Sequence, residues 1–495
     1  MSKQLLGIDI GTSACKVAAF DEEGRVLAQA NKPYQVYYPK SGWAEQDAEE
    51  WWTAICAGIR EVLDGDGVSA GEIAGIGIDG QSWSAIPVDR EGTPLARTPI
   101  WMDTRAREIC DRVKAQVGED AIFALAGNDF LPSYTTPKLL WFKENHPEIY
   151  NRTYKFLQSN SYIAMKLTGR MSQDLSQGYG LHFFDMKKLS YNEDMARELG
   201  LSTSLVPDLF GCDEVVGTVT AGASSETGLK EGTPVVAGGL DAACGTLGAG
   251  VYRTGETQEQ GGQAGGMSIC TDHPLGHKKL ILGTHVVPGL WLLQGGSVGG
   301  GGTLKWFRQE LGKGMSFDDL TKEAEAVPAG SDGVIFLPYM AGERSPIWDP
   351  DARGVYYGLG FDKTRGHLIR ATLEGVAYSL EHNLRTAYET GVRVDVLNAM
   401  GGASNSVLWT QIKADVTGKK VRVPVSDTAS TLGAAILAGV GCGVYRDYEE
   451  AVERTIRITR VQEPDPENHK RYQKSMDLYL ELYEDLKETY HKYHN

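Results

Sequence analysis

Both halves of the chain open with the same local pattern, in which a short apolar strand runs into a glycine-containing turn and a second strand follows. In the first half, residues 4–10 and 15–20 are the expected strands, and Gly11-Thr12-Ser13-Ala14 is the turn between them. In the second half, residues 257–270 hold another glycine-rich turn between expected strands. Strand and helix signals alternate after each opening. The sequence therefore predicts an α/β fold with two domains of similar design.

The length of the chain, 495 residues, agrees with more than one domain, because a domain usually holds about 100–200 residues. We expect an N-terminal domain over residues 1–245 and a C-terminal domain over residues 246–495. The connection at residues 245–256 is the expected hinge. Small-molecule sites favour the interfaces between domains, so we expect a ligand-binding cleft there.

Charge and composition exclude several classes of partner. The formal net charge is −16, which gives no field that attracts nucleic acid or an anionic membrane. No run approaches the ~20 apolar residues of a membrane helix, and the N-terminus lacks the apolar core of a signal peptide. The seven cysteines are widely spaced without a CxxC pair, so neither a disulfide framework nor a zinc site is indicated. We therefore expect a cytoplasmic protein.

The first motif with chemical content is Asp9-Ile10-Gly11-Thr12-Ser13, in which an acidic residue near the end of a buried strand precedes a hydroxyl-bearing turn. Backbone N–H groups of such a turn, with the hydroxyls of Thr12 and Ser13, can cradle phosphate oxygens. Asp9 would then hold Mg²⁺ through water, because Mg²⁺ gives up its waters reluctantly. A plain hairpin would show the same residues, so the motif alone leaves both interpretations open.

The second motif is Gly238-Gly239-Leu240-Asp241-Ala242, near the middle of the chain. Two glycines let the backbone bend and approach a ligand, and Asp241 then stands among small residues that a substrate can reach. A general base needs that access to the hydroxyl it serves. The alternative is that Asp241 simply caps the helix that follows.

Glycine loops in the second half suggest a site for an anionic or flat ligand, although the common nucleotide-binding motifs are missing. The chain has no GxxxxGK[ST] motif, and the GxGxxG at residues 75–80 lies inside an expected strand rather than after it. Two other loops, at residues 295–302 and 401–406, each precede a helical segment. The N–H groups at a helix start favour anions, and flat ligands can slide over glycines. Each loop alone could equally be a structural turn.

Taken together, the order and spacing of these motifs resembles the FGGY carbohydrate kinases, over residues ~5–440. The shared motifs are DIGTS near the N-terminus, GGLDAA in the middle, the glycine loop before LKWF, and GGASNSVLWTQIKAD near residue 410. The segments GWAEQDAEEWW, IWMDTR, PKLLWFKENHPEIY and YIAMKLTGR, with Asp174 and its neighbours, are similar to the xylulokinase members of that family.

The resemblance implies a fold and an activity. The fold would be two ribonuclease-H-like domains of the actin/hexokinase type, which flank a catalytic cleft. The activity would be ATP- and Mg²⁺-dependent phosphorylation of a primary hydroxyl of a small sugar, with D-xylulose as the first candidate. Another ketose, a sugar acid or a polyol is the alternative acceptor, and a non-catalytic actin-like module that binds sugar or nucleotide is the alternative class.

The resemblance also assigns roles to individual residues. Asp241 matches the catalytic base, and Asp9 the essential N-terminal aspartate that organises the metal through water, with Asp241 as a second candidate ligand. The substrate-binding residues would be Gln81, Ser82, Trp83, Asp103 and Asp241. The nucleotide-binding residues would be Thr12, Ser13, Gln263, Gly301, Lys305, Gly401, Gly402 and Asn405, with Ser406 beside them.

This chain departs from the family pattern in two places. Gln81-Ser82-Trp83-Ser84 stands where xylulokinases usually carry Gln-Met-His-Gly, so an indole replaces an imidazole that contacts the sugar. Such an exchange can change discrimination between acceptors greatly. The second phosphate turn reads Gly262-Gln263-Ala264-Gly265 instead of Gly-Thr-Ser, and the Gln263 amide can still donate to phosphate.

The C-terminal segment, residues 468–495, is expected to form a long charged helix with an apolar seam at heptad spacing. The seam consists of Tyr472, Met476, Tyr479, Tyr483, Leu486, Tyr490 and Tyr493. Such a face usually packs on its own domain, and the alternative is a contact between subunits of a homodimer.

Overall fold

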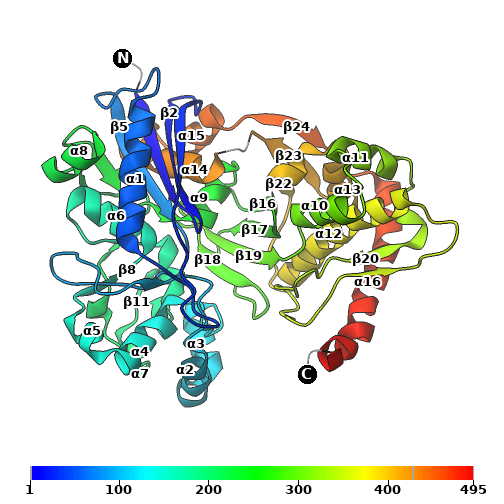
Figure 1. The fold of residues 1–495 in the computed structure, drawn as a ribbon, viewed down its shortest axis with the longest axis horizontal. Coiled ribbons are helices and arrows are strands. Elements are labelled where there is room, and N and C mark those ends of the chain that lie inside the picture. The colour runs from blue at the N-terminus through cyan, green and yellow to red at the C-terminus, as the bar shows by residue number, and fades with distance from the viewer. Residues whose placement is uncertain (1–2, 426–427, 494–495) are drawn as a thin grey trace.

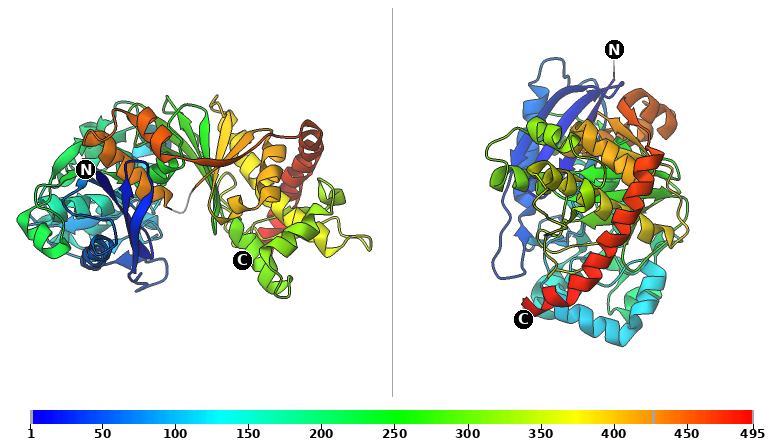
Figure 2. Two further views of the ribbon diagram at one scale, coloured as in Figure 1. Left: turned by 90° about the horizontal axis from the view of Figure 1, so that it is seen from above. Right: turned by 90° about the vertical axis from the view of Figure 1, so that its right-hand side faces the viewer.

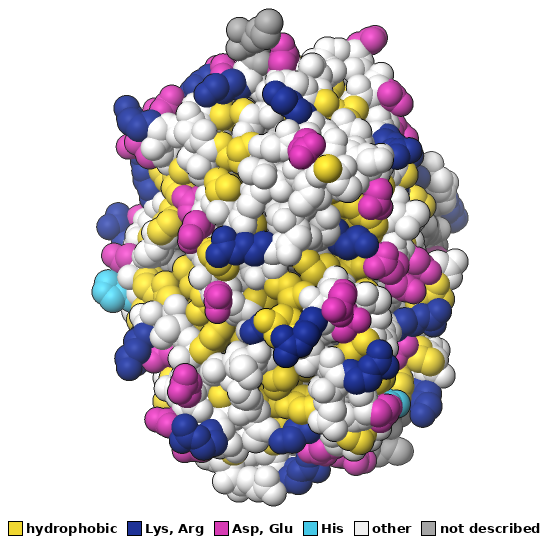
Figure 3. All heavy atoms as spheres, turned by 90° about the vertical axis from the view of Figure 1, so that its left-hand side faces the viewer, with side chains coloured by type: hydrophobic (Ala, Val, Ile, Leu, Met, Phe, Trp, Pro, Cys, Tyr) yellow, Lys and Arg dark blue, Asp and Glu magenta, His cyan; other side chains and the backbone are white. Residues whose placement is uncertain are grey.

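The structure is a computed structural model, and it describes residues 3–425 and 428–493. Figure 1 shows two units side by side, each built on a β-sheet with helices packed against it. The α/β prediction is confirmed, and the two-domain architecture with it. Acidic and basic side chains are interspersed over the outer face of the first unit, in keeping with a net charge that is spread along the chain (Figure 3).

The first sheet begins with an antiparallel meander, β1–β2–β3, and continues on the other side of β1 with parallel strands. Glycine-containing turns separate the strands of the meander, as the sequence predicts. The strands are β1 (Gln4–Ile10), β2 (Ala14–Asp21), β3 (Val26–Pro33), β5 (Ile73–Gly80), β13 (Val215–Thr218), β14 (Pro234–Val236) and β15 (Gly239–Leu240). The helices of this half are α1 (Ala48–Leu63), α2 (Arg107–Val113), α3 (Glu119–Ala126), α4 (Thr135–Asn145), α5 (Pro147–Arg152), α6 (Ser159–Thr168), α7 (Glu193–Glu198), α8 (Ala221–Thr227) and α9 (Asp241–Gly248).

The second sheet repeats this plan. Its order β19–β17–β16–β22–β23 matches β3–β2–β1–β5–β14 of the first sheet, with three antiparallel strands followed by parallel ones. The strands are β16 (Glu256–Gly261), β17 (Gly265–Thr271), β18 (Ile281–Thr284), β19 (Trp291–Ser297), β22 (Val396–Met400), β23 (Lys420–Pro424) and β24 (Ile458–Gln462). The helices are α10 (Gly301–Glu310), α11 (Phe317–Glu325), α12 (Arg365–Tyr388), α13 (Val407–Thr417), α14 (Ala429–Gly441), α15 (Tyr448–Thr455) and α16 (Pro466–Tyr493).

Short strands complete the fold outside the two main sheets. They are β4 (Glu45–Gln46) with β7 (Thr98–Pro99), β6 (Ile86–Val88) with β8 (Lys155–Leu157), β9 (Gln173–Asp174) with β12 (Leu209–Phe210), β10 (Phe184–Asp185) with β11 (Ser190–Tyr191), and β20 (Ile335–Leu337) with β21 (Val355–Tyr357).

Helix α14, from the second half of the chain, crosses back and packs against the first unit. The helix lies against β1, β5 and α9, and Figure 2 shows α14 and α15 in orange beside the blue strands of the first sheet. Contact is close because glycines face it: a Cβ at Gly7 would lie 2.0 Å from the Thr431 oxygen, and one at Gly77 would lie 1.8 Å from the Ala434 oxygen. The small residues of this segment predicted close packing, but not the surface on which it packs.

Helix α16 uses its heptad seam within its own domain. Tyr472, Met476, Tyr479, Tyr483 and Tyr490 are buried in one apolar cluster with residues of α12 and α13, while the Tyr493 side chain lies outside the description. Figure 2 shows the helix running along the second unit. The seam is therefore covered and gives no support to a homodimer contact. Within residues 3–425 and 428–493, no helix is long and apolar enough to cross a membrane.

Candidate functional site

Three strands of the first sheet end together and bring the predicted motifs to one edge. In the parallel register, Gly80 of β5 lies opposite both Ile10 of β1 and Leu240 of β15. The N–H of Gln81 donates to the Ile10 oxygen at 2.9 Å, which fixes the loop after β5 to the end of β1. The Gly11 turn, the Gln81 loop and Asp241 therefore leave the sheet at the same place. The carboxyl ends of parallel strands are where α/β sheets usually bind ligands.

Asp241 is the first residue of α9, and its Oδ1 accepts a hydrogen bond from the Ala242 N–H at 2.6 Å. The preceding glycines are needed, because a Cβ at Gly238, where φ is +74°, would lie 1.9 Å from the Ile78 oxygen. Burial, and then the charge of Asp9, raise the pKa of Asp241 to about 7. A carboxyl group with a pKa near neutrality can take a proton from a substrate and release it again.

Asp9 lies beside two charged groups that the sequence alone did not assign to the site. Lys16 is opposite Asp9 in the β1–β2 register, and its Nζ lies 3.1 Å from Asp9 Oδ2. Asp79 is opposite Asp9 in the β1–β5 register, is fully buried, and has no hydrogen-bond partner for either carboxylate oxygen among the described residues. Burial, followed by the charges of Asp9 and Asp241, raises the pKa of Asp79 well above its usual value. In the sequence, the one indication of a role for Asp79 is its position as an acidic residue near the end of a buried strand.

This group of residues concentrates negative charge, which suits a divalent cation held through water. Three carboxylates, from Asp9, Asp79 and Asp241, share one nearby lysine, and the Asp79 carboxylate is unpaired within the described part of the chain. A buried carboxylate without hydrogen bonds is costly, and carboxylates with water are the ligands that Mg²⁺ takes in phosphate-transfer sites.

The loop after β5 forms an aromatic wall at this edge. Trp83 is buried, with its ring 4.2 Å from the Tyr134 ring in a stacked arrangement and 5.6 Å from the Tyr179 ring. The Trp83 indole N–H and the Gln81 Oε1 have no partner in the described part of the chain, whereas Gln81 Nε2 donates to Gln46 Oε1 at 2.6 Å. Burial raises the pKa of Tyr179 well above its usual value, and a hydrogen bond with Ser82 lowers this pKa in part. That hydrogen bond places Ser82 at the same wall. These unpartnered polar atoms suit a polar ligand.

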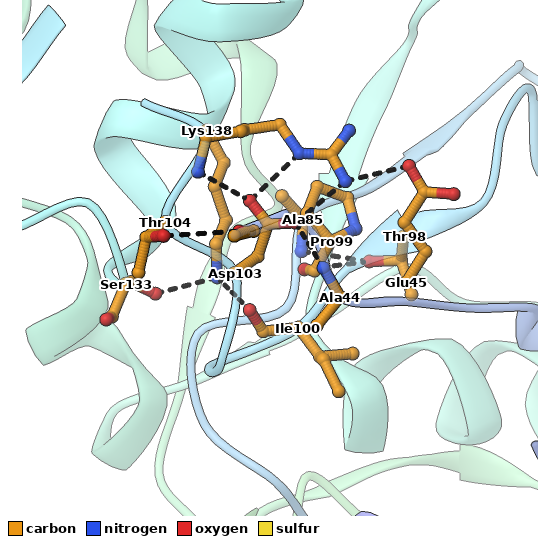
Figure 4. Close-up of polar contacts among 12 residues, drawn as sticks. Ala44, Glu45, Ala85, Thr98, Pro99, Ile100, Asp103, Thr104, Ser133 and Lys138 are labelled. Atoms are coloured by element: carbon orange, nitrogen blue, oxygen red, sulfur yellow. Dashed lines mark hydrogen bonds and ion pairs between the residues drawn. The ribbon is translucent and has the colours of Figure 1, made fainter. Parts of the chain in front are cut away.

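Asp103 has a different environment from the other predicted substrate residues. It is fully buried, and its oxygens accept from the Ala44 N–H at 2.7 Å and from Arg105, whose Nε and Nη lie at 2.9 and 2.7 Å. Figure 4 shows this network, which ties Asp103 to the segment that holds Ala44 and Glu45. These hydrogen bonds anchor the loop that holds Ala44, and the role of Asp103 as a sugar contact stays a prediction.

The turn that follows Asp9 is held from two sides. Trp101 Nε1 donates to the Thr12 hydroxyl at 2.9 Å, and Gln46 Nε2 donates to the Thr12 carbonyl at 2.8 Å. Ser13 is exposed at the tip. The Thr12 hydroxyl keeps its own hydrogen for a further acceptor, as a phosphate-binding turn requires.

The glycine loops of the second half meet backbone to backbone. The Gly301 N–H donates to the Gly262 oxygen at 2.6 Å, and the Gly302 N–H to the Gln263 oxygen at 3.0 Å. A Cβ at Gly401, where φ is +79°, would lie 2.9 Å from the Gly261 backbone. The structure thus brings the predicted residues Gln263, Gly301 and Gly401 together.

Three further predicted nucleotide residues lie at the surface of these loops. A Cβ at Gly402 would meet nothing within 4 Å, so open space lies above this residue. Asn405 is exposed after it, and Lys305 is exposed one turn into α10. An open glycine next to exposed polar side chains suits a flat ligand with phosphates.

Comparison with known proteins agrees with this fold. The chain matches the FGGY family of carbohydrate kinases, with the N-terminal domain over residues 4–248 and the C-terminal domain over residues 267–442. It belongs to this family and is a sugar kinase, a phosphotransferase that uses ATP as the phosphate donor.

Its relatives show which members of the family it is similar to. The chain is 30% identical to the xylulose kinase of Bacillus subtilis (strain 168), over 98% of each chain. It is also 30% identical to the L-xylulose/3-keto-L-gulonate kinase of Escherichia coli (strain K12), over 97% of each. The crystal structure of xylulose kinase from Rhodospirillum rubrum matches with a TM-score of 0.91 and 29% identity, over 99% of this chain and 100% of that one. The prediction of an FGGY kinase similar to xylulokinases is confirmed.

Proposed function

We propose that this kinase phosphorylates a primary hydroxyl of a ketopentose, with D-xylulose as the first acceptor, and that Asp241 is its catalytic base. The relatives named above support the acceptor, since full-length similarity to xylulose kinases covers both domains. One structural observation supports the base. Asp241 starts a helix at the edge where β1, β5 and β15 end, beside Asp9, and its pKa is raised to about 7.

The proposed reaction is an in-line transfer. The acceptor oxygen attacks the γ-phosphorus of ATP, the bond from that phosphorus to the bridging oxygen breaks, and ADP leaves. The hydroxyl proton passes to the Asp241 carboxylate. Asp9 would hold Mg²⁺ through water, with Asp241 as a second candidate, and the ion would supply positive charge against the phosphates when bound. Lys16 adds a positive charge at the same place.

Other residues would bind the two substrates. Gln81, Ser82 and Trp83 would face the sugar, because they follow β5 beside Asp241. Thr12 and Ser13 would face the phosphates from the first domain. Gln263, Gly301, Lys305, Gly401, Gly402 and Asn405 would hold the nucleotide on the second. The proposal includes a cytoplasmic location, which the seven unpaired cysteines support, because disulfides are rare in reducing compartments.

A panel of acceptors tests the proposal. Purified protein is incubated with Mg²⁺ and ATP and either D-xylulose, L-xylulose, D-ribulose, gluconate, glycerol or erythritol, and the phosphorylated product is identified by mass spectrometry. We expect the highest kcat/KM with D-xylulose. A higher value with another acceptor would correct the sugar and leave the base untouched. Thermal stabilisation by sugars without any phosphorylated product would instead indicate a non-catalytic binding module.

A further inference from the structure

Lys138 is a fully buried lysine in the first turns of α4, and its ammonium group donates to three backbone carbonyls. The Nζ atom lies 2.7 Å from the Trp83 oxygen, 2.8 Å from the Ile100 oxygen and 2.7 Å from the Ser133 oxygen. An ammonium has three N–H donors and no acceptor, so these bonds use its whole capacity. Figure 4 shows the Lys138 side chain reaching between Ile100 and Ser133.

The three carbonyls belong to three separate loops. Trp83 lies in the loop after β5, Ile100 follows β7, and Ser133 precedes α4. A single cation therefore ties together segments that have no regular secondary structure at these positions. An apolar side chain of similar volume would let α4 pack but would take the donor from the Trp83 and Ser133 carbonyls, whereas the Ile100 oxygen would keep the Asp103 N–H at 2.9 Å.

The hydrogen bond from Lys138 to the Trp83 carbonyl holds a residue whose backbone conformation is strained. The φ of Trp83 is +60°, in the left-handed region that side chains other than glycine rarely adopt. Such a conformation persists where the surroundings hold it, and it clusters at ligand sites. Tyr134, at the start of the same helix, stacks its ring on Trp83. Helix α4 thus holds the carbonyl of Trp83 through Lys138 and its ring through Tyr134.

The fixed ring lies at the proposed acceptor site. Trp83 contacts Tyr179, whose pKa is raised by burial and in part by the charge of Asp241. There is no spare room behind the indole, because a Cβ at Gly180 would lie 2.8 Å from Trp83 Cδ1. A change at the Trp83 backbone would therefore change where the indole ring lies.

The Lys138 ammonium donates to backbone carbonyls and forms no ion pair among the described residues. Asp103 is the carboxylate whose charge acts on it, and that carboxylate is already paired with Arg105 at 2.7 Å, which also contacts Glu45 at 2.7 Å. Burying a charge is expensive, and an apolar replacement often costs less. Burial lowers the pKa of Lys138 to about 7, and in its protonated form the ammonium group is held by the three backbone carbonyls.

We propose that Lys138 is a positioning residue for the acceptor: its ammonium sets the Trp83 loop, and so the shape of the wall that selects the sugar. The inference rests on the proposed function, which places Trp83 at the acceptor. It concerns no direct contact between Lys138 and substrate.

The test compares Lys138→Met with a matched control, Lys155→Met. Lys155 also donates to two carbonyls, those of Ser204 and Val206, each at 2.8 Å, in the same half of the chain. With the acceptor that the panel identifies, we expect Lys138→Met to lower kcat/KM for the sugar about 10- to 100-fold through a higher KM, because small misplacements have effects of that size. The KM for ATP should stay unchanged, and Lys155→Met should leave both KM values unchanged. Equal losses toward sugar and ATP would overturn the proposal.

A double-mutant cycle separates positioning from general damage. Trp83→Phe removes the indole but keeps the carbonyl that Lys138 binds. If Lys138 acts through Trp83, the double variant should lose little more sugar affinity than the more affected single variant. Additive losses would contradict the inference.

A measurement on the unaltered protein covers the case in which Lys138→Met does not fold. Hydrogen exchange is followed with and without the acceptor, at saturating Mg²⁺ and ADP. We expect the acceptor to protect the loops around residues 83, 100 and 133 together. Protection confined to the loop around residue 83 would overturn the inference. A wild-type protein that phosphorylates nothing would instead remove the proposed function, so the two failures differ.

Discussion

Asp9 and Asp79 lie opposite each other on the parallel strands β1 and β5, and both side chains are almost fully buried. Lys16 pairs with Asp9, whereas the Asp79 carboxylate has no hydrogen-bond partner among the described residues. The sheet register therefore forces two acidic groups together at the edge that also carries Asp241. Repulsion between buried acidic groups is expected where a protein keeps a site ready for a cation. A substitution that relieves this repulsion should therefore raise stability and lower activity.

Replacing Asp79 by Asn should stabilise the protein and impair catalysis. The change removes a buried, unpaired carboxylate that Asp9 and Asp241 repel, so we expect a gain of about 0.5–2 kcal/mol in the free energy of unfolding. We expect kcat to fall and the Mg²⁺ concentration for half-maximal activity to rise. Denaturant unfolding at neutral pH and a Mg²⁺ titration followed by thermal shift measure the two effects.

Asp103→Asn is the matched control for the expected stabilisation by Asp79→Asn. Asp103 is equally buried but accepts hydrogen bonds from Arg105 and Ala44, so its replacement should destabilise the fold by about 3–5 kcal/mol.

The pH dependence of stability gives a second check on Asp79. The folded pKa of Asp79 is raised, so the native state binds more protons than the unfolded state above about pH 4. The free energy of unfolding should therefore fall as pH rises from there. The Asp79→Asn variant should lose part of that slope. Destabilisation by Asp79→Asn would contradict this account of the site.

The rate should follow the protonation of Asp241. Its pKa is raised to about 7, and a base works only when deprotonated, so kcat/KM should rise with pH and level off above neutrality. Lys16 lowers that pKa, so Lys16→Met should move the midpoint of the profile to higher pH. Profiles from pH 5 to 9 at saturating Mg²⁺ measure this shift. A midpoint that moves to lower pH would show that Lys16 does not act on the base.

Two neighbouring glycines should respond differently to alanine. Gly402 has open space where a Cβ would lie, so Gly402→Ala should leave stability within about 0.5 kcal/mol and raise the KM for ATP by blocking the flat surface. Gly401 has φ of +79° and would meet the Gly261 backbone, so Gly401→Ala should destabilise the fold by more than about 1 kcal/mol. Thermal unfolding and ATP kinetics of both variants decide this, and an unchanged KM for ATP in Gly402→Ala would remove Gly402 from the nucleotide site.

Local patterns were enough to predict part of this site. Asp9 and Asp241 each lie in a short motif whose residue types indicate phosphate binding or proton transfer. The glycine loops are predicted as turns from their residues alone. The roles of Asp79 and Lys16 depend on which strands pair and in what register. That information is not local, since β5 begins more than sixty residues after β1 ends.

The same reason explains what the sequence left open in the fold. The heptad spacing of α16 predicted a buried face, and Tyr479 is buried, but the spacing does not name the partner surface. The small residues of α14 predicted close packing, yet only the chain path brings Ala434 onto Gly77 of the first sheet. For Asp103, the family resemblance predicts a sugar contact, and only the fold shows its hydrogen bonds to Arg105 and Ala44.

The central claim is that Asp241 takes the proton of the acceptor hydroxyl. The most direct measurement is single-turnover formation of the phosphorylated sugar by Asp241→Asn, with ATP affinity measured by calorimetry on the same protein. We predict a loss of about 10²–10⁴-fold in the rate of phosphoryl transfer, because an amide cannot accept the proton, with ATP affinity retained. A near-normal rate with intact ATP binding would contradict the account.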